Sequence, residues 1–325
     1  MHLDNVDRSL LNLIQAGFPL TQEPYVDLAQ RLDTSSDEVV QRIAQLKKRG
    51  IIRMIGPVLD SRSLGYQTTL VAMKVAKTEL EKAEQAIAGH PGVSHGYERE
   101  HQFNVWFTLA LPQASDIETE LKQLTRFTGA EAAFSLPAIK VFKIGAYFDM
   151  DENGQNAPTA QRNNVLAKQA ELSSADRLII NQLQQDLPLI PAAFSAMAER
   201  AGMDTEQFLA GCRSLQQRGV IRRFSASINH KNAGFTANAM CCWAAPAKTT
   251  DAAGQKLASS KEVSHCYERE TNQFWHYNLF AMIHGRSRGI CQGIADKISR
   301  ETGLTDYVSL YSAKEFKKTR IKYQV

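Results

Sequence analysis

Seven consecutive residues, 95–101, bring together side chains that can transfer protons and bind anions. If this segment is a strand, alternate side chains point to one face. His95, Tyr97, Arg99 and His101 would then share a face, and the two glutamates between them would lie on the other. Imidazoles transfer protons near neutral pH, and a guanidinium binds carboxylates through two parallel hydrogen bonds. This face is therefore our first candidate for a functional site.

Large aromatic side chains follow directly, at Phe103, Trp106 and Phe107. Flat rings beside cations suit a flat, anionic, aromatic ligand. The alternative is a polar outer face of a sheet, where arginine and glutamate pair across strands for little free energy. The aromatic run favours a ligand over this alternative.

The motif occurs twice, because residues 263–270 repeat residues 93–100 with a single difference. The second motif therefore carries its own histidine and arginine, His265 and Arg269. Further matches at an offset of about 169 residues run through the whole chain. The chain is thus two tandem copies of one unit.

The two copies differ at positions that matter for the candidate site. Thr271 stands where the first copy has His101, and Arg223 stands where the first copy has Met54. We infer that the copies have specialised, with the fuller set of histidines in the first. Whether the second copy forms a site of its own or only adds residues to the first site is open.

Each copy begins with three helix patterns and continues with alternating strands and helices. The third helix of each copy opens on a capping residue, Ser35 or Asp204, and stops at Gly50 or Gly219, which predicts a helix-turn-helix unit. In the first copy we predict strands at 68–75, 93–99, 105–111 and 131–136, with helices at 79–88 and 115–127. This βαββαβ order is ferredoxin-like. The predicted fold class is α+β, a tandem duplicate that forms an internal pseudo-dimer.

The repeat divides the chain into five predicted segments. Copy one consists of a helix-turn-helix domain at 1–60 and a ferredoxin-like, AsnC-type domain at 61–150. Residues 151–170, rich in Asn, Gln, Ala and Gly, are predicted to be a flexible linker. Copy two repeats the two domains at 171–229 and 230–325.

Composition narrows the classes of protein. The 325 residues carry 38 Lys and Arg against 34 Asp and Glu, a net charge of +4. So small a surplus, with acidic first turns in both candidate recognition helices, argues against DNA binding. No run of 18 apolar residues occurs, which argues against a membrane helix. The five cysteines form no CxxC pair and fit reduced thiols, so we expect a cytoplasmic protein.

Other basic residues and histidines leave more than one interpretation open. Arg53, Arg222 and Arg223 lie where the helix-turn-helix units end, and carboxylate binding and a solvated surface charge are equally open for them. His230 and His284 have no counterpart in the first copy, and we interpret them as structural or surface histidines. The sequence contains no Walker loop, Rossmann glycine fingerprint or HExxH motif, so we expect no metal site.

The architecture and the motif resemble known families. A helix-turn-helix joined to βαββαβ, with Gly-Ile-Ile-Arg at 50–53, resembles the Lrp/AsnC regulators, which would imply a transcription regulator that senses a tetrapyrrole or an amino acid. Residues 95–101 and 104–107, with the copy at 265–270, resemble the siroheme decarboxylases, which keep the regulator fold. The tandem arrangement resembles two of their subunits fused in one chain. This second resemblance implies a carbon-carbon lyase that removes carbon dioxide from the C12 and C18 acetates of siroheme. The product would be 12,18-didecarboxysiroheme, for haem d1 or alternative haem biosynthesis.

The resemblance also implies roles for individual residues. His95 and His101 would donate protons or orient the substrate, and Arg99 would clamp a carboxylate, which makes these three the predicted catalytic set. Substrate binding is predicted for Tyr97, Trp106, Arg53, Arg222, Arg223, His265 and Arg269. Siroheme would be the substrate and its own electron sink, with no added cofactor. Other haem-biosynthesis proteins and a second copy of the chain are further candidate partners, and a haem-binding scaffold without turnover is a third alternative.

Overall fold

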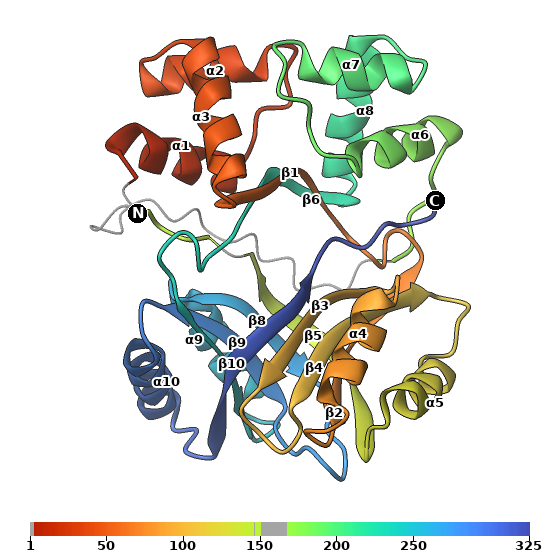
Figure 1. Ribbon diagram of the computed structural model, residues 1–325, viewed down its shortest axis with the longest axis vertical. Coiled ribbons are helices and arrows are strands. Elements are labelled where there is room, and N and C mark those ends of the chain that lie inside the picture. Colours follow the sequence, from red (N-terminus) through yellow and green to blue (C-terminus); the bar gives the residue numbers. More distant parts are fainter. Residues whose placement is uncertain (1–2, 146, 151–167) are drawn as a thin grey trace.

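The computed structural model describes residues 3–145, 147–150 and 168–325, so most of the predicted linker lies outside the described residues. Two helix-turn-helix units lie side by side on top of a β-barrel, and a two-stranded ribbon lies between them and the barrel (Figure 1). No helix in the described ranges is long and apolar enough to cross a membrane.

The third helix of each helix-turn-helix unit begins and ends where the sequence predicts. Copy one contains α1 (Asn5–Ala16), α2 (Pro24–Leu32) and α3 (Ser36–Lys48), and copy two contains α6 (Ser174–Leu183), α7 (Ala193–Arg200) and α8 (Thr205–Gln217). The Ser35 hydroxyl accepts a hydrogen bond from the Glu38 amide at 3.2 Å, and the Asp204 carboxylate accepts one from the Gln207 amide at 2.8 Å. Gly50, just past α3, has a φ of 66°, which a side chain would disfavour. The predicted caps are confirmed.

The strands that leave the two units pair with each other. β1 (Ile52–Leu59) and β6 (Ile221–Ile228) form an antiparallel ribbon. The two units and this ribbon share one continuous apolar core. We call the two helix-turn-helix units and this ribbon the cap of the barrel. The cap is therefore built equally from both copies.

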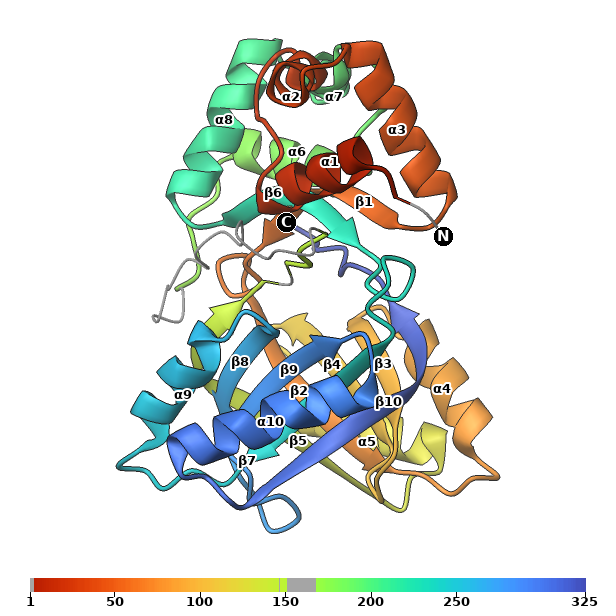
Figure 2. The ribbon, with the colours of Figure 1, turned by 90° about the vertical axis from the view of Figure 1, so that its left-hand side faces the viewer.

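Eight strands close the barrel below the ribbon. Copy one supplies β2 (Tyr66–Lys74), β3 (Val93–Arg99), β4 (Val105–Pro112) and β5 (Ala132–Ile144), and copy two supplies β7 (Ala237–Trp243), β8 (Val263–Arg269), β9 (Leu279–Gly285) and β10 (Tyr307–Lys318). Around the barrel the order is β10-β3-β4-β2-β5-β8-β9-β7. Outside it lie α4 (Leu80–Gly89), α5 (Ile117–Thr128), α9 (Thr250–Ser259) and α10 (Arg288–Thr302) (Figure 2).

The last strand of each copy is exchanged between copies. β5 pairs with β2 through residue 137 and then with β8 of the other copy from Ala138 to Ile144. In the same way, β10 pairs first with β7 and then with β3 from Ser312 to Lys318. The predicted end of the first of these strands, residue 136, was too early, because the continuation has its partner in the other copy. This exchange turns two sheets into one barrel.

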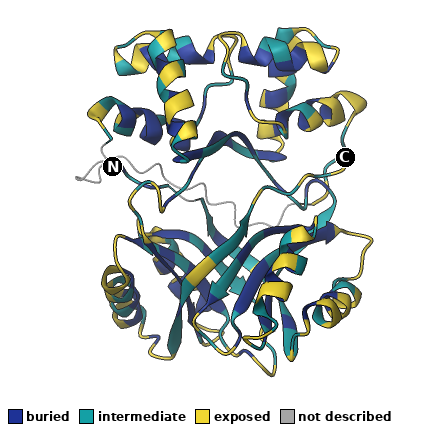
Figure 3. Ribbon diagram, viewed as in Figure 1, coloured by how far each residue is buried: buried dark blue, intermediate teal, exposed yellow. Residues whose placement is uncertain are grey.

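The barrel interior is apolar at the end away from the cap. Ten buried side chains fill that end, contributed by both copies: Ala72, Phe103, Trp106, Phe134, Leu136, Met240, Cys242, Trp275, Phe280 and Leu310. Two further cores lie between the sheets and the outer helices. Exposed residues concentrate on the outer faces of the helices (Figure 3).

Candidate functional site

The predicted motif lines the barrel interior, and its two copies face each other. β3 and β8 are four strands apart in an eight-stranded barrel, which places them on opposite walls. Gly96 packs against Phe316 outside the barrel, where an added Cβ would lie 2.3 Å from the ring. His95 and Tyr97, its neighbours on the strand, therefore point inward.

Arg99 and Arg269 are held in equivalent positions inside the barrel. The Nη1 of Arg99 donates to the Leu310 carbonyl at 2.8 Å, and the Nη1 of Arg269 donates to the Leu136 carbonyl at 2.8 Å. Burial lowers the pKa of both guanidinium groups to about 10, so both remain charged near neutral pH. The structure describes no carboxylate paired with either of them.

A polar network connects to His95 on the wall formed by β3 and the end of β10, which we call the β3 side. Glu315 lies beside Tyr97 in the sheet, and its Oε1 is 2.7 Å from Nη2 of Arg53. The ammonium of Lys318, the neighbour of His95 in register, is 3.6 Å from the other oxygen of Glu315. The β3 side therefore contains one acid, Glu315, that offsets part of the charge of its two cations.

His230 extends this network into the second copy. Its Nδ1 is 3.4 Å from Nζ of Lys318, and its Nε2 is 3.1 Å from Nδ2 of Asn238. The Asn238 oxygen accepts from the Ser312 hydroxyl, which in turn accepts from Arg99. A continuous chain of contacts thus joins the cap arginine to the barrel arginine.

The opposite wall, formed by β8 and the end of β5 and called the β8 side, has different neighbours. Val141 and Ile144 occupy the register positions that Glu315 and Lys318 hold across the barrel. The Ser264 hydroxyl lies 2.9 Å from Nδ1 of His265 and 2.9 Å from Nε2 of His284. Here two imidazoles share one hydroxyl, and no acid from the described part of the chain takes part.

The imidazoles of the two walls have low pKa values. Burial, with Lys318 and Arg53 nearby, lowers the pKa of His95 to about 4 although Glu315 acts in the opposite direction. Burial, with His95, Lys318, Arg223 and Lys143, lowers the pKa of His265 to about 3. Both rings are neutral near neutral pH when only protein groups surround them. The arrangement is a cationic site with neutral imidazoles, suited to a ligand that brings several negative charges.

Family models match both copies. The model for the siroheme decarboxylase NirDL-like helix-turn-helix domain matches residues 7–53 and 176–222. The model for the AsnC-like ligand-binding domain matches residues 63–143 and 232–317. The chain is 38% identical to a siroheme decarboxylase of Hydrogenobacter thermophilus over 318 residues, which cover 97% of this chain and 93% of that protein. The chain belongs to the siroheme decarboxylase family.

Two further siroheme decarboxylases resemble this chain, one as a separate subunit and one as a crystal structure. A siroheme decarboxylase alpha subunit of Desulfovibrio desulfuricans is 42% identical over 46% of this chain and 87% of its own length. A single copy here thus corresponds to a separate subunit there. A crystal structure of the siroheme decarboxylase NirDL in co-complex with an iron-uroporphyrin III analogue is 34% identical, with a TM-score of 0.72. The match covers 98% of this chain and 94% of that one.

Two of the predicted site residues of this siroheme decarboxylase family member lie away from the others. His101 lies beyond the end of β3, where its ring centroid is 5.4 Å from that of Trp275. Trp106 faces inward but is 1% exposed, and its indole nitrogen donates to the Phe103 carbonyl. Both belong to the aromatic end of the barrel, so neither is next to His95.

The three cap arginines have different partners. Arg222 pairs with the buried carboxylate of Asp60, and Arg53 pairs with Glu315. Arg223 donates to the Ser225 hydroxyl at 3.0 Å and has no carboxylate partner in the described part of the chain. Of the three, Arg223 is the one left available to a ligand carboxylate.

Sequence reasoning missed four members of the cluster, namely His230, His284, Glu315 and Lys318. His230 is fully buried, and burial together with Lys318 lowers its pKa to about 4. Because none of the four is repeated in the first copy, self-comparison could not point to them. The expectation that the first copy holds the fuller histidine set is not met, since three of the four imidazoles gathered here come from the second copy. Among the residues that the structure describes, no group of histidine, cysteine and acidic side chains could hold a metal ion.

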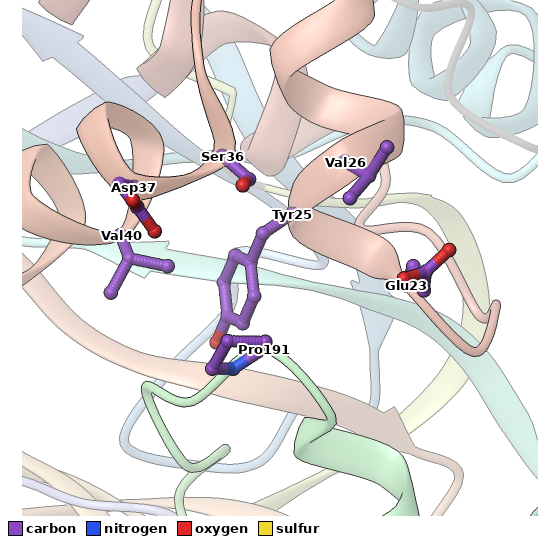
Figure 4. A pocket seen from close by; sticks show the side chains of 7 residues that line it. All are labelled: Glu23, Tyr25, Val26, Ser36, Asp37, Val40 and Pro191. Atoms are coloured by element: carbon purple, nitrogen blue, oxygen red, sulfur yellow. The ribbon is translucent and has the colours of Figure 1, made fainter.

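Two hollows on the surface lie apart from this cluster. The first, of about 20 Å³, lies between Tyr25, Ser36 and Pro191 in the cap (Figure 4). That volume is close to one water molecule, so it does not fit a macrocycle. The second, of about 350 Å³, is lined by residues that include Tyr66 and Gln169. Neither hollow has a histidine in its lining.

Proposed function

We propose that this chain decarboxylates siroheme. It removes carbon dioxide from the C12 and C18 acetates and releases 12,18-didecarboxysiroheme, as a carbon-carbon lyase of haem d1 or alternative haem biosynthesis. The observation that supports this best is the pair of inward-facing motifs, in which Arg99 shares a strand with His95 and Arg269 shares a strand with His265, in a chain of the siroheme decarboxylase family.

The arginines suit a substrate with many carboxylates. A buried guanidinium that keeps its charge binds a carboxylate more strongly than one in water, because the surrounding dielectric constant is low. Arg99 and Arg269 each have one hydrogen bond to a main-chain carbonyl that fixes the side chain, and both remain charged near neutral pH. We assign them the role of holding substrate carboxylates in place.

The chemical step requires one proton for each acetate. The bond between the methylene carbon and the carboxylate carbon breaks, carbon dioxide leaves, and the electron pair stays on the methylene carbon. The conjugated macrocycle next to this carbon delocalises the charge, so no added cofactor is needed. A proton then adds to the methylene carbon and leaves a methyl group, and we assign its delivery to an imidazole of the cluster.

The low pKa values of the imidazoles give the substrate a part in this step. Lys318, Arg53 and Arg223 help to hold the rings of His95 and His265 neutral. Substrate carboxylates near these cations would offset their charge and raise the pKa of each ring. An imidazole would therefore gain its proton when the substrate binds, close to the step that consumes it.

Gene regulation has less support. On α3, Arg42 pairs with Asp4, Asp7 and Glu38, and directly after α8, Arg218 pairs with Asp176. Basic side chains that are engaged within the protein contribute less to binding phosphates. We therefore propose that the helix-turn-helix units act mainly as the cap of the barrel.

Anaerobic incubation of the purified chain with siroheme, followed by mass spectrometry, tests the function. We expect the macrocycle to lose two carbon dioxide units. Siroheme recovered with all its carboxylates would contradict the proposal. A shift of the Soret band without any mass change would instead support a binding scaffold, and a salt-sensitive gel shift with upstream DNA would support a regulator.

A further inference from the structure

Two arginines meet at the centre of the cap ribbon, above the barrel. Arg320 donates from Nη1 to the Pro57 carbonyl at 2.8 Å, and a Cβ added at Gly56 would lie 2.9 Å from the same nitrogen. Arg223 donates from Nε to the Ser225 hydroxyl, and Ser225 is the register partner of Gly56 in the ribbon. The two guanidinium groups are thus fixed beside one pair of facing residues.

These two arginines lack an acidic partner among the described residues. No ion pair within 4.0 Å joins either of them to a carboxylate among the residues that the structure describes. Asp186, the acid that most affects the charge state of Arg320, is bound by the Lys47 ammonium at 2.6 Å. Burial lowers the pKa of Arg320 to about 10 and also lowers that of Arg223. Two partly buried positive charges therefore lie near each other, and Asp186, which is already bound by Lys47, offsets them only in part. Such a pair is costly unless an anion joins it.

The pair lies over the β8 side of the barrel. Gly145 has a φ of 148°, and a Cβ added there would be 3.3 Å from Nη1 of Arg223. The Gly145 amide donates to the Ser264 carbonyl at 3.0 Å, and Ser264 directly precedes His265. The guanidinium of Arg223 thus lies next to Gly145, whose amide is bound to the main chain beside this imidazole.

On the β3 side a carboxylate of the protein, Glu315, lies near the position that corresponds to that of Arg223 on the β8 side. Met54 is the residue of β1 that corresponds to Arg223, so one cation is missing there. The remaining cations, Arg53 and Lys318, both contact Glu315. That carboxylate belongs to the protein and leaves these cations less available to a ligand.

We propose that Arg223 and Arg320 form the receptor for two neighbouring carboxylates of the substrate, so that the reacting acetate is held at His265. On the β3 side Glu315 takes the place of a substrate carboxylate, and the chain holds one macrocycle at a time, in one orientation for each decarboxylation. The nature of the ligand rests on the proposed function. The receptor itself rests on the placement of the two unpaired arginines.

Binding of iron-uroporphyrin III to the full chain, followed by absorbance titration, tests the receptor independently of turnover. Arg223→Met installs the residue of the first copy, and Arg320→Met removes the other cation. We expect each to weaken binding by about 10- to 100-fold, as expected for loss of a charge-assisted contact. The control is Arg213→Met, a cap arginine paired with Glu206 at the surface, which should bind as the unaltered chain does.

The outcomes separate the receptor from the function. Unaltered affinity in both variants, or two equal macrocycles bound to each chain, would overturn the receptor even if siroheme is decarboxylated. Weakened binding in a chain that never decarboxylates siroheme would keep the receptor and reject the function. Arg223→Lys keeps the charge without the bidentate geometry, so its affinity for iron-uroporphyrin III should lie between those of the unaltered chain and Arg223→Met. This variant also tests the receptor if Arg223→Met does not fold.

Discussion

On the β3 side, Arg53 and Lys318 meet the carboxylate of Glu315, whereas on the β8 side Arg223 meets no carboxylate within the described ranges. Both walls have the same main-chain pairing and an inward-facing histidine. A symmetric pair of identical subunits would have to place the same charges on both walls. Fusion of the copies removes that constraint, so the charge of one wall can be partly offset by the protein while the other wall is left to a ligand.

The two walls also differ in how their outer faces pack. Phe316 lies against Gly96 on the β3 side, and a Cβ added at this glycine would be 2.3 Å from the ring. On the β8 side the corresponding strand residue is Cys266, and Phe142 lies instead against Gly254, whose added Cβ would be 2.4 Å from that ring. A glycine is present on each side, but on a different element. The two copies therefore have separate, mutually adjusted packing and are not interchangeable.

The largest contrast between the walls should appear in catalysis. If the reacting acetate is held at His265, His265→Gln should slow single-turnover decarboxylation by about 10²- to 10⁴-fold, as loss of a general acid does. His95→Gln should slow it much less, because that ring belongs to the β3 side, where Glu315 already occupies the cations. Quenched-flow measurement of carbon dioxide release compares the two variants directly. Equal losses would mean that both walls react, and a larger loss for His95 would reverse the assignment.

The buried imidazoles should make folding stability sensitive to acid. The pKa values of His95 and His230 are lowered to about 4 and that of His265 to about 3, from an ordinary value near 6.5. The unfolded chain binds more protons below pH 6.5, so stability is complete above that pH and falls as the pH drops toward 4. We expect each imidazole to contribute on the order of 1 kcal/mol to the loss between pH 7 and pH 5.

Thermal unfolding between pH 7 and pH 5 measures this loss of stability. Repeating the measurement with a bound polycarboxylate ligand tests its cause. Several cations face these rings from other elements, namely Arg53, Lys143, Arg223, Lys231 and Lys318, with Glu315 as the opposing acid. The ligand should raise the pKa values and flatten the pH dependence. His276→Gln, at the exposed end of the barrel, is the control and should leave the slope unchanged. A melting temperature that does not fall between pH 7 and pH 5 would contradict neutral, buried imidazoles.

Exchange of a packing residue between the walls should destabilise the fold. Gly96→Cys gives β3 the residue of β8, but its Cβ would collide with Phe316. Overpacking of this kind costs about 1–3 kcal/mol. Urea unfolding of Gly96→Cys measures the cost, with Cys266→Ala as a control that removes a sulfur without adding volume. A Gly96→Cys variant as stable as the unaltered chain would show that the Phe316 ring moves aside freely.

Much of the fold could be predicted from the sequence. The helix caps, the strand at 93–99 and the duplicated α+β plan are local features, set by residues near each other in the chain, and all are confirmed. The family also follows from the motif, since residues 95–101 and their copy carry the resemblance and the family models agree. The local sequence pattern was enough to predict these features because each depends on few contacts between residues far apart in the sequence.

The arrangement of the site could not be predicted in the same way. β5 continues to Ile144 only because β8 of the other copy pairs with its second half. That continuation places Val141 beside the second motif, and the matching continuation of β10 along β3 places Glu315 beside the first. Alternation correctly turned His95, Tyr97 and Arg99 inward, but it does not hold beyond Arg99, where β3 ends and His101 enters a loop. Tertiary pairing between copies thus decides which charges meet.

The smallest contrast between the copies concerns the cap. There, matching glutamines of the two copies bind the segments that follow β5 and β10. The Gln15 side chain exchanges hydrogen bonds with the main chain of Phe148 at 3.0 and 3.1 Å, and the Gln184 side chain does the same with Tyr323 at 2.6 and 3.0 Å. Gln15 is 1% exposed, whereas Gln184 is only partly buried. Gln15→Ala should therefore lower the free energy of unfolding by about 1–3 kcal/mol, because it leaves buried main-chain groups unpaired.

Gln184→Ala should cost less, since water can replace the lost bonds at a partly exposed position. Phe148 also packs on His230 and His284, with ring centroids 5.8 and 5.1 Å away, so its release would loosen two imidazoles of the cluster. Gln15→Ala should then weaken iron-uroporphyrin III binding slightly, whereas Gln184→Ala should not. Urea unfolding and the absorbance titration measure both effects. If the two variants lose the same stability and bind equally well, the asymmetry is confined to the barrel and does not extend into the cap.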